Sequence, residues 1–342
     1  MAATIKDIAK QTGLGLATIS SYLNGGNVRE QNRIKIEQAI HELNYEVNEV
    51  ARGLKTNRTK LIGIIIPELN NIFCAEIITE VEDILRSHGY ATMICDCRTD
   101  ENREKEAVLF LKKRRVDGVI IMPSTNKGRH FGKLIKAGIP IVLLDRKMDD
   151  IDCDCVLVDN QNGAKDAVRR LILAGHRKIG MITGPKQVFT ARERLAGYCQ
   201  ALEEAGIAVE EKLVCHSEYT ITGGIEGLRR LIKQNPDMTA VFVSNYELTM
   251  GVVIEANELN LRIPEQLSVI GFDNVEFARA CLPKLSIVSQ PTKEIARKVS
   301  ELMLQRLEPE AEEGNSVIVK LKTGFVEGKS VKIRKSSREE MP

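Results

Sequence analysis

Polar side chains gather in the short segments that follow the apolar runs of this 342-residue sequence. They are chiefly Asp, Asn and Arg with a few aromatic residues, a set that hydrogen-bonds hydroxyl groups and stacks on sugar rings. Their composition predicts a binding site for a small polyhydroxyl ligand. The segments cover residues 67–73, 123–126, 145–146, 159–162, 184–194, 244–246 and 273–277.

The elements that carry these segments alternate regularly after residue 60. Short Ile- and Val-rich runs predict strands at 61–67, 91–96, 117–122, 139–144, 155–158, 178–183, 240–243 and 267–271. Amphipathic segments predict helices near 73–88, 101–114, 129–137, 163–174, 191–205, 223–234, 246–260 and 292–306. Eight such strands predict two doubly wound parallel sheets in series, with a break near 158–162. Ligands in these folds bind outside the carboxyl ends of the strands, which is where the polar segments lie.

Composition excludes several classes of protein. No apolar stretch approaches the ~20 residues that a membrane-spanning helix needs, and the N-terminus lacks the apolar segment of a secretory signal. We therefore expect a cytoplasmic protein with no membrane partner. The eight cysteines have no framework spacing, and the pairs Cys95/Cys97 and Cys153/Cys155 have no nearby histidine at zinc-site spacing. We interpret both pairs as strand residues and expect no metal and no cofactor.

Residues 1–60 differ from the rest because every apolar period there is helical. Thr4 can cap a first helix together with Asp7, Gly13 suits a tight turn, and a second helix ends at the Asn-Gly-Gly sequence of residues 24–26. Two short helices joined in this way predict a helix-turn-helix, although spacing alone also allows an ordinary three-helix bundle. Nine Lys or Arg and six Asp or Glu give this segment a net charge of +3, which suits phosphate binding.

Ordered sequence blocks identify the family that the chain resembles. The first 67 residues contain TIKDIAKQTGLGLATISSYLN and ELNYEVNEVARGLKTNRTKLIGIIIP. The blocks NNIFCAEI, DGVIIMP, GIPIVLLDR, GHRKIGMITGP, ARERLAGY, VIGFDN and LSIVSQP follow in this order. Together they closely resemble the lactose/galactose repressor family of bacterial transcription regulators, over nearly the whole chain to about residue 330. This resemblance favours a DNA-binding head over an ordinary bundle.

The resemblance implies an α/β protein with an N-terminal all-α helix-turn-helix head. The core would have two lobes of doubly wound parallel sheet, like periplasmic sugar-binding proteins. It implies a head at 1–47, a hinge helix and linker at 48–60, an N-terminal lobe at 61–158 with 290–318, a C-terminal lobe at 159–289 with 319–333, and a polar tail at 334–342. The implied partners are double-stranded operator DNA, a small effector such as a sugar or sugar phosphate, and a second copy of the chain. No leucine heptad follows residue 330, so we expect a homodimer.

The resemblance also assigns DNA-binding residues. In the second helix of the head, Leu16, Ala17 and Ser21 match the base-reading positions. Polar contacts are expected from Thr4, Thr18 and Asn24. In the hinge the assigned residues are Asn48, Ala51 and Leu54, and the leucine matching Leu54 wedges into the minor groove and kinks the DNA.

The head departs from the family pattern at three places. Gly15 and Ser21 stand where members usually have Ser and Arg, and Val47 replaces the proline before the hinge. Glycine is a tolerable helix cap, but the loss of Arg removes the commonest bidentate partner of guanine. We therefore expect an operator that differs from the usual family consensus.

For the effector, the resemblance assigns the sugar-contacting positions to Asp145, Arg194, Tyr219, Asn245 and Asp273. Phe73 is expected to close the other side of the ligand and is the sixth effector-binding residue. The two carboxylates can accept hydroxyl protons, the guanidinium offers a rigid donor fork, and the aromatic rings can cover a sugar ring. Tyr246 stands where the family often has Asp, so the wall of the cleft is expected to differ. Purines, phosphosugars and a phosphorylated carrier protein therefore stay open as effectors.

An enzyme is the rival class. The sequence contains no G-x-G-x-x-G after the first strand, no P-loop and no G-x-S-x-G elbow, and its five histidines are dispersed. Hydrolysis by Asp145 and Asp273 would need a set separation with one of the two protonated, whereas they sit on different lobes among Arg and Asn. We predict a binding protein with no catalytic residue.

Overall fold

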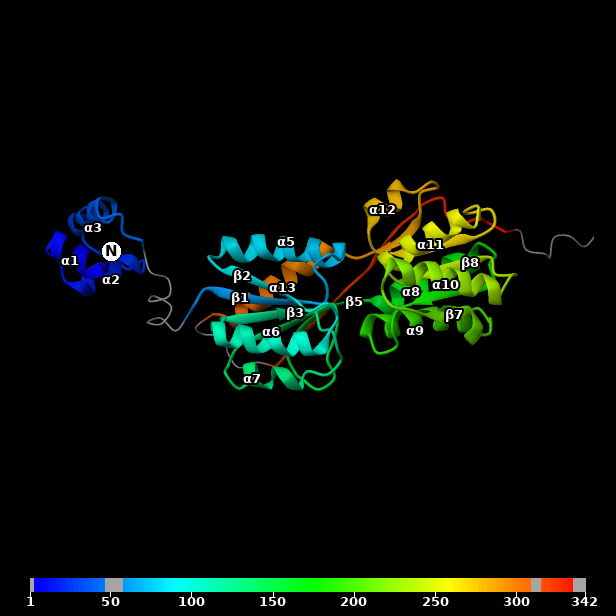
Figure 1. The fold of residues 1–342 in the computed structure, drawn as a ribbon, viewed down its shortest axis with the longest axis horizontal. Helices are drawn as coiled ribbons and strands as arrows, with labels where there is room; N and C mark the ends of the chain where they lie inside the picture. The colour runs from blue at the N-terminus through cyan, green and yellow to red at the C-terminus, as the bar shows by residue number, and fades with distance from the viewer. Residues whose placement is uncertain (1–2, 47–57, 309–314, 335–342) are drawn as a thin grey trace, which may run out of the picture. The chain divides into compact units, whose positions relative to one another are not determined.

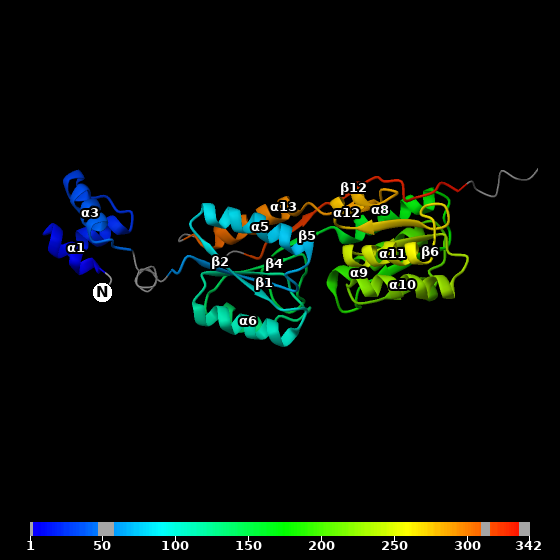
Figure 2. The same ribbon diagram turned by 45° about the horizontal axis from the view of Figure 1, so that its top comes forward.

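The computed structural model describes residues 3–46, 58–308 and 315–334. The chain divides into two compact units, residues 1–60 and 61–342, and each is described by itself. Figures 1 and 2 show the elements of both units.

The first unit is a small helical domain of α1 (Ile5–Thr12), α2 (Leu16–Leu23) and α3 (Glu30–Glu42). Its core is formed by Ile8, Ile19, Ile36 and Ala39, which are almost fully buried. Gly13 ends α1 in the left-handed conformation, with a φ of 67°, which a residue without a Cβ adopts at no steric cost. The predicted pair of short helices and the turn between them are confirmed.

The second unit contains two six-stranded sheets. The first sheet has the order β11-β5-β4-β3-β1-β2, and every neighbouring pair is parallel. Its strands are β1 (Leu61–Ile66), β2 (Ala91–Asp96), β3 (Gly118–Ile121), β4 (Ile141–Leu144), β5 (Asp154–Val158) and β11 (Ile318–Leu321).

The second sheet has the order β12-β10-β9-β8-β6-β7, in which only the edge pair of β10 and β12 is antiparallel. Its strands are β6 (Ile179–Thr183), β7 (Val214–His216), β8 (Ala240–Val243), β9 (Ser268–Phe272), β10 (Ser286–Ser289) and β12 (Gly324–Val326). The fold class of two doubly wound sheets in series is confirmed.

Helices cover both faces of each sheet because the central strands are apolar on both sides. On the first sheet, α5 (Ile72–Ser87) and α13 (Thr292–Arg306) pack on one face, and α6 (Glu101–Arg114) and α7 (Gly132–Ile135) on the other (Figure 1). On the second sheet, α8 (Asn160–Leu173) and α9 (Phe189–Glu204) pack on one face. The opposite face is covered by α10 (Ile221–Gln234) and α11 (Tyr246–Glu258). A short helix, α12 (Val275–Ala280), follows β9.

The chain crosses between the two lobes three times. The crossings follow β5 and β10, near the expected places, and the third lies between β11 and β12. The expected boundary between residues 318 and 319 is wrong, because β11 pairs along its whole length with β5 of the first sheet. The third crossing therefore comes after Leu321.

The predicted helix at 129–137 is also corrected. It is a 3₁₀ turn, Arg129–Phe131, followed by the four-residue α7, so the amphipathic pattern there covers two short pieces. A second 3₁₀ turn, Glu211–Leu213, precedes β7.

Candidate functional site

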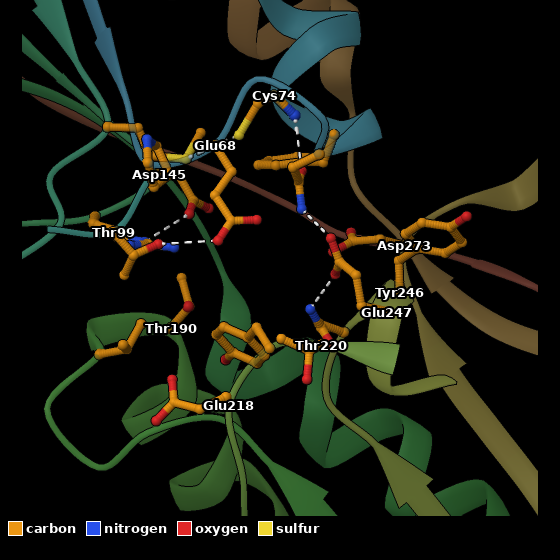
Figure 3. Close-up of a pocket in the computed structure, with 18 of the residues that line it drawn as sticks. Glu68, Cys74, Thr99, Asp145, Thr190, Glu218, Thr220, Tyr246, Glu247 and Asp273 are labelled. Carbon is orange, nitrogen blue, oxygen red and sulfur yellow. Dashed lines mark hydrogen bonds and ion pairs between the residues drawn. The ribbon is translucent and has the colours of Figure 1, made fainter. Parts of the chain in front are cut away.

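A cavity of about 410 Å³ opens among the loops at the carboxyl ends of both sheets (Figure 3). All six residues that the sequence assigned to an effector line it, so side chains 200 residues apart in the chain are brought together. They are Phe73, Asp145, Arg194, Tyr219, Asn245 and Asp273. A cavity of this volume suits a small molecule.

Two aspartates that line the cavity each follow the last residue of a strand, one in each sheet. Asp145 directly follows β4 and Asp273 directly follows β9, and both adopt left-handed backbone with φ of 64° and 66°. Aspartate tolerates this conformation better than most residues. Only 4% of Asp145 and 8% of Asp273 is exposed to solvent. Both carboxylates are therefore held at the cavity in a desolvated state.

Asp273 is surrounded by donors. Gln290 donates from Nε2 to Asp273 Oδ1 at 2.6 Å, and Arg194 Nη1 lies 3.8 Å from Asp273 Oδ2. Burial raises the pKa of Asp273 to about 6, although the Arg194 charge and the Gln290 hydrogen bond oppose that rise. The carboxylate is thus oriented before any ligand arrives.

Arg194 is fixed by contacts within its own lobe. Its Nε donates to Asn160 Oδ1 at 2.8 Å and its Nη1 donates to the backbone oxygen of Ser244 at 2.5 Å. The guanidinium also stacks on the ring of Phe272, 3.6 Å from the ring centroid. Because these contacts occupy several of its donors, Arg194 serves the cavity as a rigid wall and as the counter-charge of Asp273.

Asp145 is less fully partnered than Asp273. Its Oδ2 lies 3.6 Å from Arg146 Nε, whereas its buried Oδ1 has no hydrogen-bond partner among the described residues. Burial raises the pKa of Asp145, and the nearby Arg146 and Arg194 oppose the rise. The free oxygen is an acceptor that a bound ligand can satisfy.

Asn245 caps the helix α11. Its Oδ1 accepts from the Leu248 backbone N–H at 3.0 Å, and its Nδ2 donates to the Glu247 carboxylate. Both halves of the amide are therefore engaged within the chain.

Glu247 is a cavity residue that the sequence analysis missed. Its Oε1 accepts from Asn71 Nδ2 at 2.5 Å, so it joins α11 of the C-terminal lobe to the N-cap residue of α5 in the N-terminal lobe. The expected loss of a carboxylate at Tyr246 is thus made good by the next residue. A glutamate in the first turn of a helix is common, so its identity gave no signal.

The aromatic side chains frame the cavity. Tyr219 lies against Gly184, where a Cβ would come 2.3 Å from Tyr219 Cζ, so only glycine leaves room for the ring. Tyr246 packs edge-on against Phe277 at 5.6 Å between ring centroids, with its hydroxyl end visible in Figure 3. Phe73 lines the cavity and packs against the core of the N-terminal lobe.

The assigned residues of the head fall into two groups. Leu16 is 46% exposed and, with the exposed Ala17 and the half-buried Thr18, forms the first turn of α2, which begins after Gly15. Thr4 and Asn24 have local structural contacts. The Thr4 hydroxyl and N–H donate to Asp7 at 2.7 and 2.8 Å, and Asn24 Nδ2 donates to the Ser20 oxygen at 2.6 Å.

Ser21 lies on the same helix, facing its end. A Cβ at Gly26 would come 2.4 Å from Ser21 Oγ, so this glycine is packed on the serine. The assigned hinge residues Asn48, Ala51 and Leu54 lie outside the described residues.

The described residues were also compared with the expectations about metal ions, cysteines and membrane-spanning helices. Within residues 3–46, 58–308 and 315–334, no group of His, Cys, Asp or Glu is arranged to hold a metal ion. All eight cysteines are free thiols. The interpretation of both pairs as strand residues holds for Cys95 and Cys155, whereas Cys97 directly follows β2 and Cys153 directly precedes β5. No described helix is long and apolar enough to span a membrane.

A helix-turn-helix unit followed by a two-lobed core with a ligand-sized cavity defines the class of ligand-controlled DNA-binding proteins. Comparison with known families supports this class. The family described as "Bacterial regulatory proteins, lacI family" matches residues 4–48. The family described as "Periplasmic binding proteins and sugar binding domain of LacI family" matches residues 59–327.

Similar proteins cover nearly the full length. Catabolite control protein A of Priestia megaterium is 32% identical over 93% of this chain and 96% of its own. The HTH-type transcriptional repressor PurR of Proteus mirabilis is 34% identical, over 93% of this chain and 94% of its own. The ribose operon repressor of Haemophilus influenzae is 34% identical, over 89% and 92%.

Solved structures give the same result. A complex of the transcriptional regulator CelR with cellobiose is 28% identical, with a TM-score of 0.73 over 96% of this chain and 99% of that one. A lac repressor dimer bound to operator and an anti-inducer has a TM-score of 0.85 over 97% of this chain and 100% of that one. At 24% sequence identity, this similarity shows that the fold is shared. The chain belongs to the LacI family of bacterial transcription regulators. It is a DNA-binding transcription regulator, and its relatives are repressors rather than enzymes.

Proposed function

We propose that the chain represses transcription by binding operator DNA as a homodimer, and that a small polyhydroxyl effector in the cavity sets its affinity for DNA. The observation that carries the proposal is the convergence of six polar and aromatic side chains from both lobes on one cavity. A ligand held by both lobes stabilises one arrangement of them, which is how a small molecule can shift a conformational equilibrium.

In the cavity, Asp145 and Asp273 would accept ligand hydroxyls, and Arg194 would fix the position of Asp273. Tyr219 and Phe73 would contact the apolar faces of the ligand, and Asn245 would contribute through the position of α11. The free Oδ1 of buried Asp145 supports a ligand that brings hydrogen-bond donors. The ribose operon repressor among the relatives and the cellobiose complex among the solved structures support a sugar as the effector class.

On DNA, Leu16, Ala17, Thr18 and Ser21 would face the base edges of the major groove, and Thr4 and Asn24 would approach the backbone or bases from the helix ends. The hinge residues Asn48, Ala51 and Leu54 would enter the minor groove. The site of action would be the cytoplasm, where bacterial operators are.

A two-part binding experiment tests this function. Promoter fragments of the organism's own genome are screened by gel shift with the full chain, and sugars, sugar phosphates and purines are screened by thermal shift. We expect a specific fragment to shift and at least one compound both to raise the unfolding temperature and to change the gel shift. A chain that shifts no fragment, or turns over a compound of the panel, would contradict the proposal.

A further inference from the structure

The charged side chains that line the cavity are unevenly balanced. Five of them are acidic and three are basic, so the lining has an excess of two carboxylates. The acidic residues are Glu68, Asp145, Glu218, Glu247 and Asp273, and the basic ones are Arg98, Arg146 and Arg194.

Two of the arginines are committed to the two buried aspartates. Arg194 pairs with Asp273, and Arg146 pairs with Asp145 while its Nη1 donates to the Pro123 oxygen at 3.0 Å. The third, Arg98, has a side chain that is 71% exposed and lies 3.8 Å from Asp96. None of the three arginines therefore forms an ion pair with the remaining acidic residues of the lining.

Three glutamates are left without a cationic partner among the described residues. Glu247 is held only by the neutral amides of Asn71 and Asn245. Glu68 accepts from the Thr99 hydroxyl at 3.3 Å, and Glu218 stands exposed at the mouth of the cavity. Figure 3 shows Glu68 and Glu247 pointing into the cavity from different sides, and Glu218 on the loop below them. A partly buried carboxylate without a counter-charge is destabilised by desolvation, and a cation brought by a ligand removes that cost.

Unpartnered atoms in the lining point to the same ligand chemistry. The buried Asp145 Oδ1 and Gln290 Oε1 have no hydrogen-bond partner, and both can only accept. Tyr219 Oη is also unpartnered and can donate or accept, and the unpartnered donor Arg146 Nε is directed toward Asp145. The cavity therefore needs several donors from its occupant.

From the charge excess and the unpartnered acceptors, we infer that the cavity selects a small polyol that carries a primary ammonium group, such as an amino sugar, over neutral and phosphorylated analogues. Glu247 and Glu68 are the residues that would receive the ammonium, and Asp145 would receive a hydroxyl. Phosphate would meet the three unpaired glutamates and is disfavoured by like charge. This inference rests on the proposed function and narrows its effector class.

Matched ligand sets test the inference with the full chain. Each set holds one ring and changes one substituent, as in glucosamine, glucose, N-acetylglucosamine and glucose 6-phosphate, with the galactose and mannose series alongside. Binding is measured by calorimetric titration. We expect the amine of at least one series to bind about tenfold or more tighter than its neutral partners, which corresponds to ~1.4 kcal/mol.

Substitutions then locate the effect. Glu247→Gln and Glu68→Gln keep the shape of the side chain, so each should lower amine affinity about tenfold and change neutral-sugar affinity less than threefold. Glu226→Gln, an exposed glutamate on α10 outside the cavity, is the matched control and should change neither. Two variants in different elements guard against one that fails to fold.

Three results would overturn the inference of an ammonium-bearing ligand. A neutral or phosphorylated sugar that binds as tightly as its amine, or an amine preference that survives both Gln variants, overturns the inference while leaving a ligand-controlled repressor intact. No binding by any amine of the three series also overturns it. Loss of operator binding by the unmodified chain is a separate result, and it would contradict the proposed function instead.

Discussion

The Asp273 carboxylate is held by Gln290 and Arg194, and its removal has a defined consequence. In Asp273→Ala, Gln290 and Arg194 lose their shared partner and the ligand loses an acceptor. We expect effector affinity to fall by about tenfold to several-hundredfold, the equivalent of ~1–3 kcal/mol or more for a lost charged contact. Calorimetric titration of the identified effector measures this. Unchanged affinity in both Asp273→Ala and Arg194→Ala would contradict the cavity assignment and favour a protein coeffector.

A smaller change tests the aromatic wall. Gly184→Ala places a Cβ 2.3 Å from Tyr219 Cζ, so the ring must move away from its present position. We expect effector affinity to fall by about tenfold, with stability lowered by the ~1–3 kcal/mol typical of overpacking. Gly132→Ala is the control, because nothing lies within 4 Å of its Cβ and its backbone is helical. Equal effects in the two variants would show that Tyr219 does not form the wall.

The raised pKa of Glu247 is expected to make the free energy of unfolding depend on pH. Burial raises the pKa of Glu247 to about 7, and the nearby Asp273 and Glu68 charges add to the rise. A carboxyl whose folded pKa lies above its unfolded value stabilises the fold at low pH. That stability is lost as pH rises from about 4.5 to about 7. The slope is at most ~1.4 kcal/mol per pH unit for one group. Urea unfolding from pH 5 to 8 should show Glu247→Gln flattening this slope, and an unchanged slope would contradict the assignment.

At the scale of elements, one ion pair joins three separate segments. Asp154 of β5 accepts from Arg306 of α13 at 2.8 and 2.9 Å and from the Val317 N–H at 2.8 Å. Arg306→Ala leaves the buried Asp154 without its cation, so we expect the free energy of unfolding to fall by roughly 3 kcal/mol. Arg297→Ala on the same helix, whose exposed pair with Glu301 contributes little, should change it by less than about 0.5 kcal/mol. Denaturant titration of the two variants distinguishes these expectations.

The same scale shows what the sequence could predict. The eight strands predicted from apolar runs are present. Seven of them are interior strands of the two sheets, which need apolar residues on both faces, and the eighth is the edge strand β2. Four strands were missed, β7, β10, β11 and β12, because within each of them at most two apolar residues follow one another. Three of the four, β7, β11 and β12, also lie at sheet edges. In the cavity, four of the assigned residues lie within the ordered family blocks, namely Phe73, Asp145, Arg194 and Asp273, and Tyr219 and Asn245 lie between blocks. Glu247, Asn71 and Gln290 were missed because a polar residue at a helix or strand end gives no local signal for the partner it meets.

For the whole molecule, the modest +3 charge of residues 1–60 limits how tightly one head can hold DNA. We expect tight operator binding only from the paired full chain, with affinity falling steeply between about 50 and 200 mM salt through counterion release. Gel shifts of the full chain and of an isolated 1–58 fragment across this salt range measure both effects. Equal affinity of fragment and full chain would contradict the requirement for a dimer.

The hinge assignment gives a second test with DNA. If Leu54 wedges between base pairs, Leu54→Ala should weaken specific operator binding by a few kcal/mol, the scale of the contacts to bent DNA, and leave effector affinity unchanged. Operator affinity within threefold of the parent would count against the assignment.

The three crossings between the lobes also govern the order in which the protein can be completed during synthesis. Residues 1–60 are a contiguous unit, whereas each sheet of the core receives an edge strand only when β11 and β12 have been made, at residues 318–326. A nascent chain therefore has its whole DNA-binding unit long before either lobe is finished. A message cut short before residue 318 encodes a head attached to a core in which both sheets lack a strand.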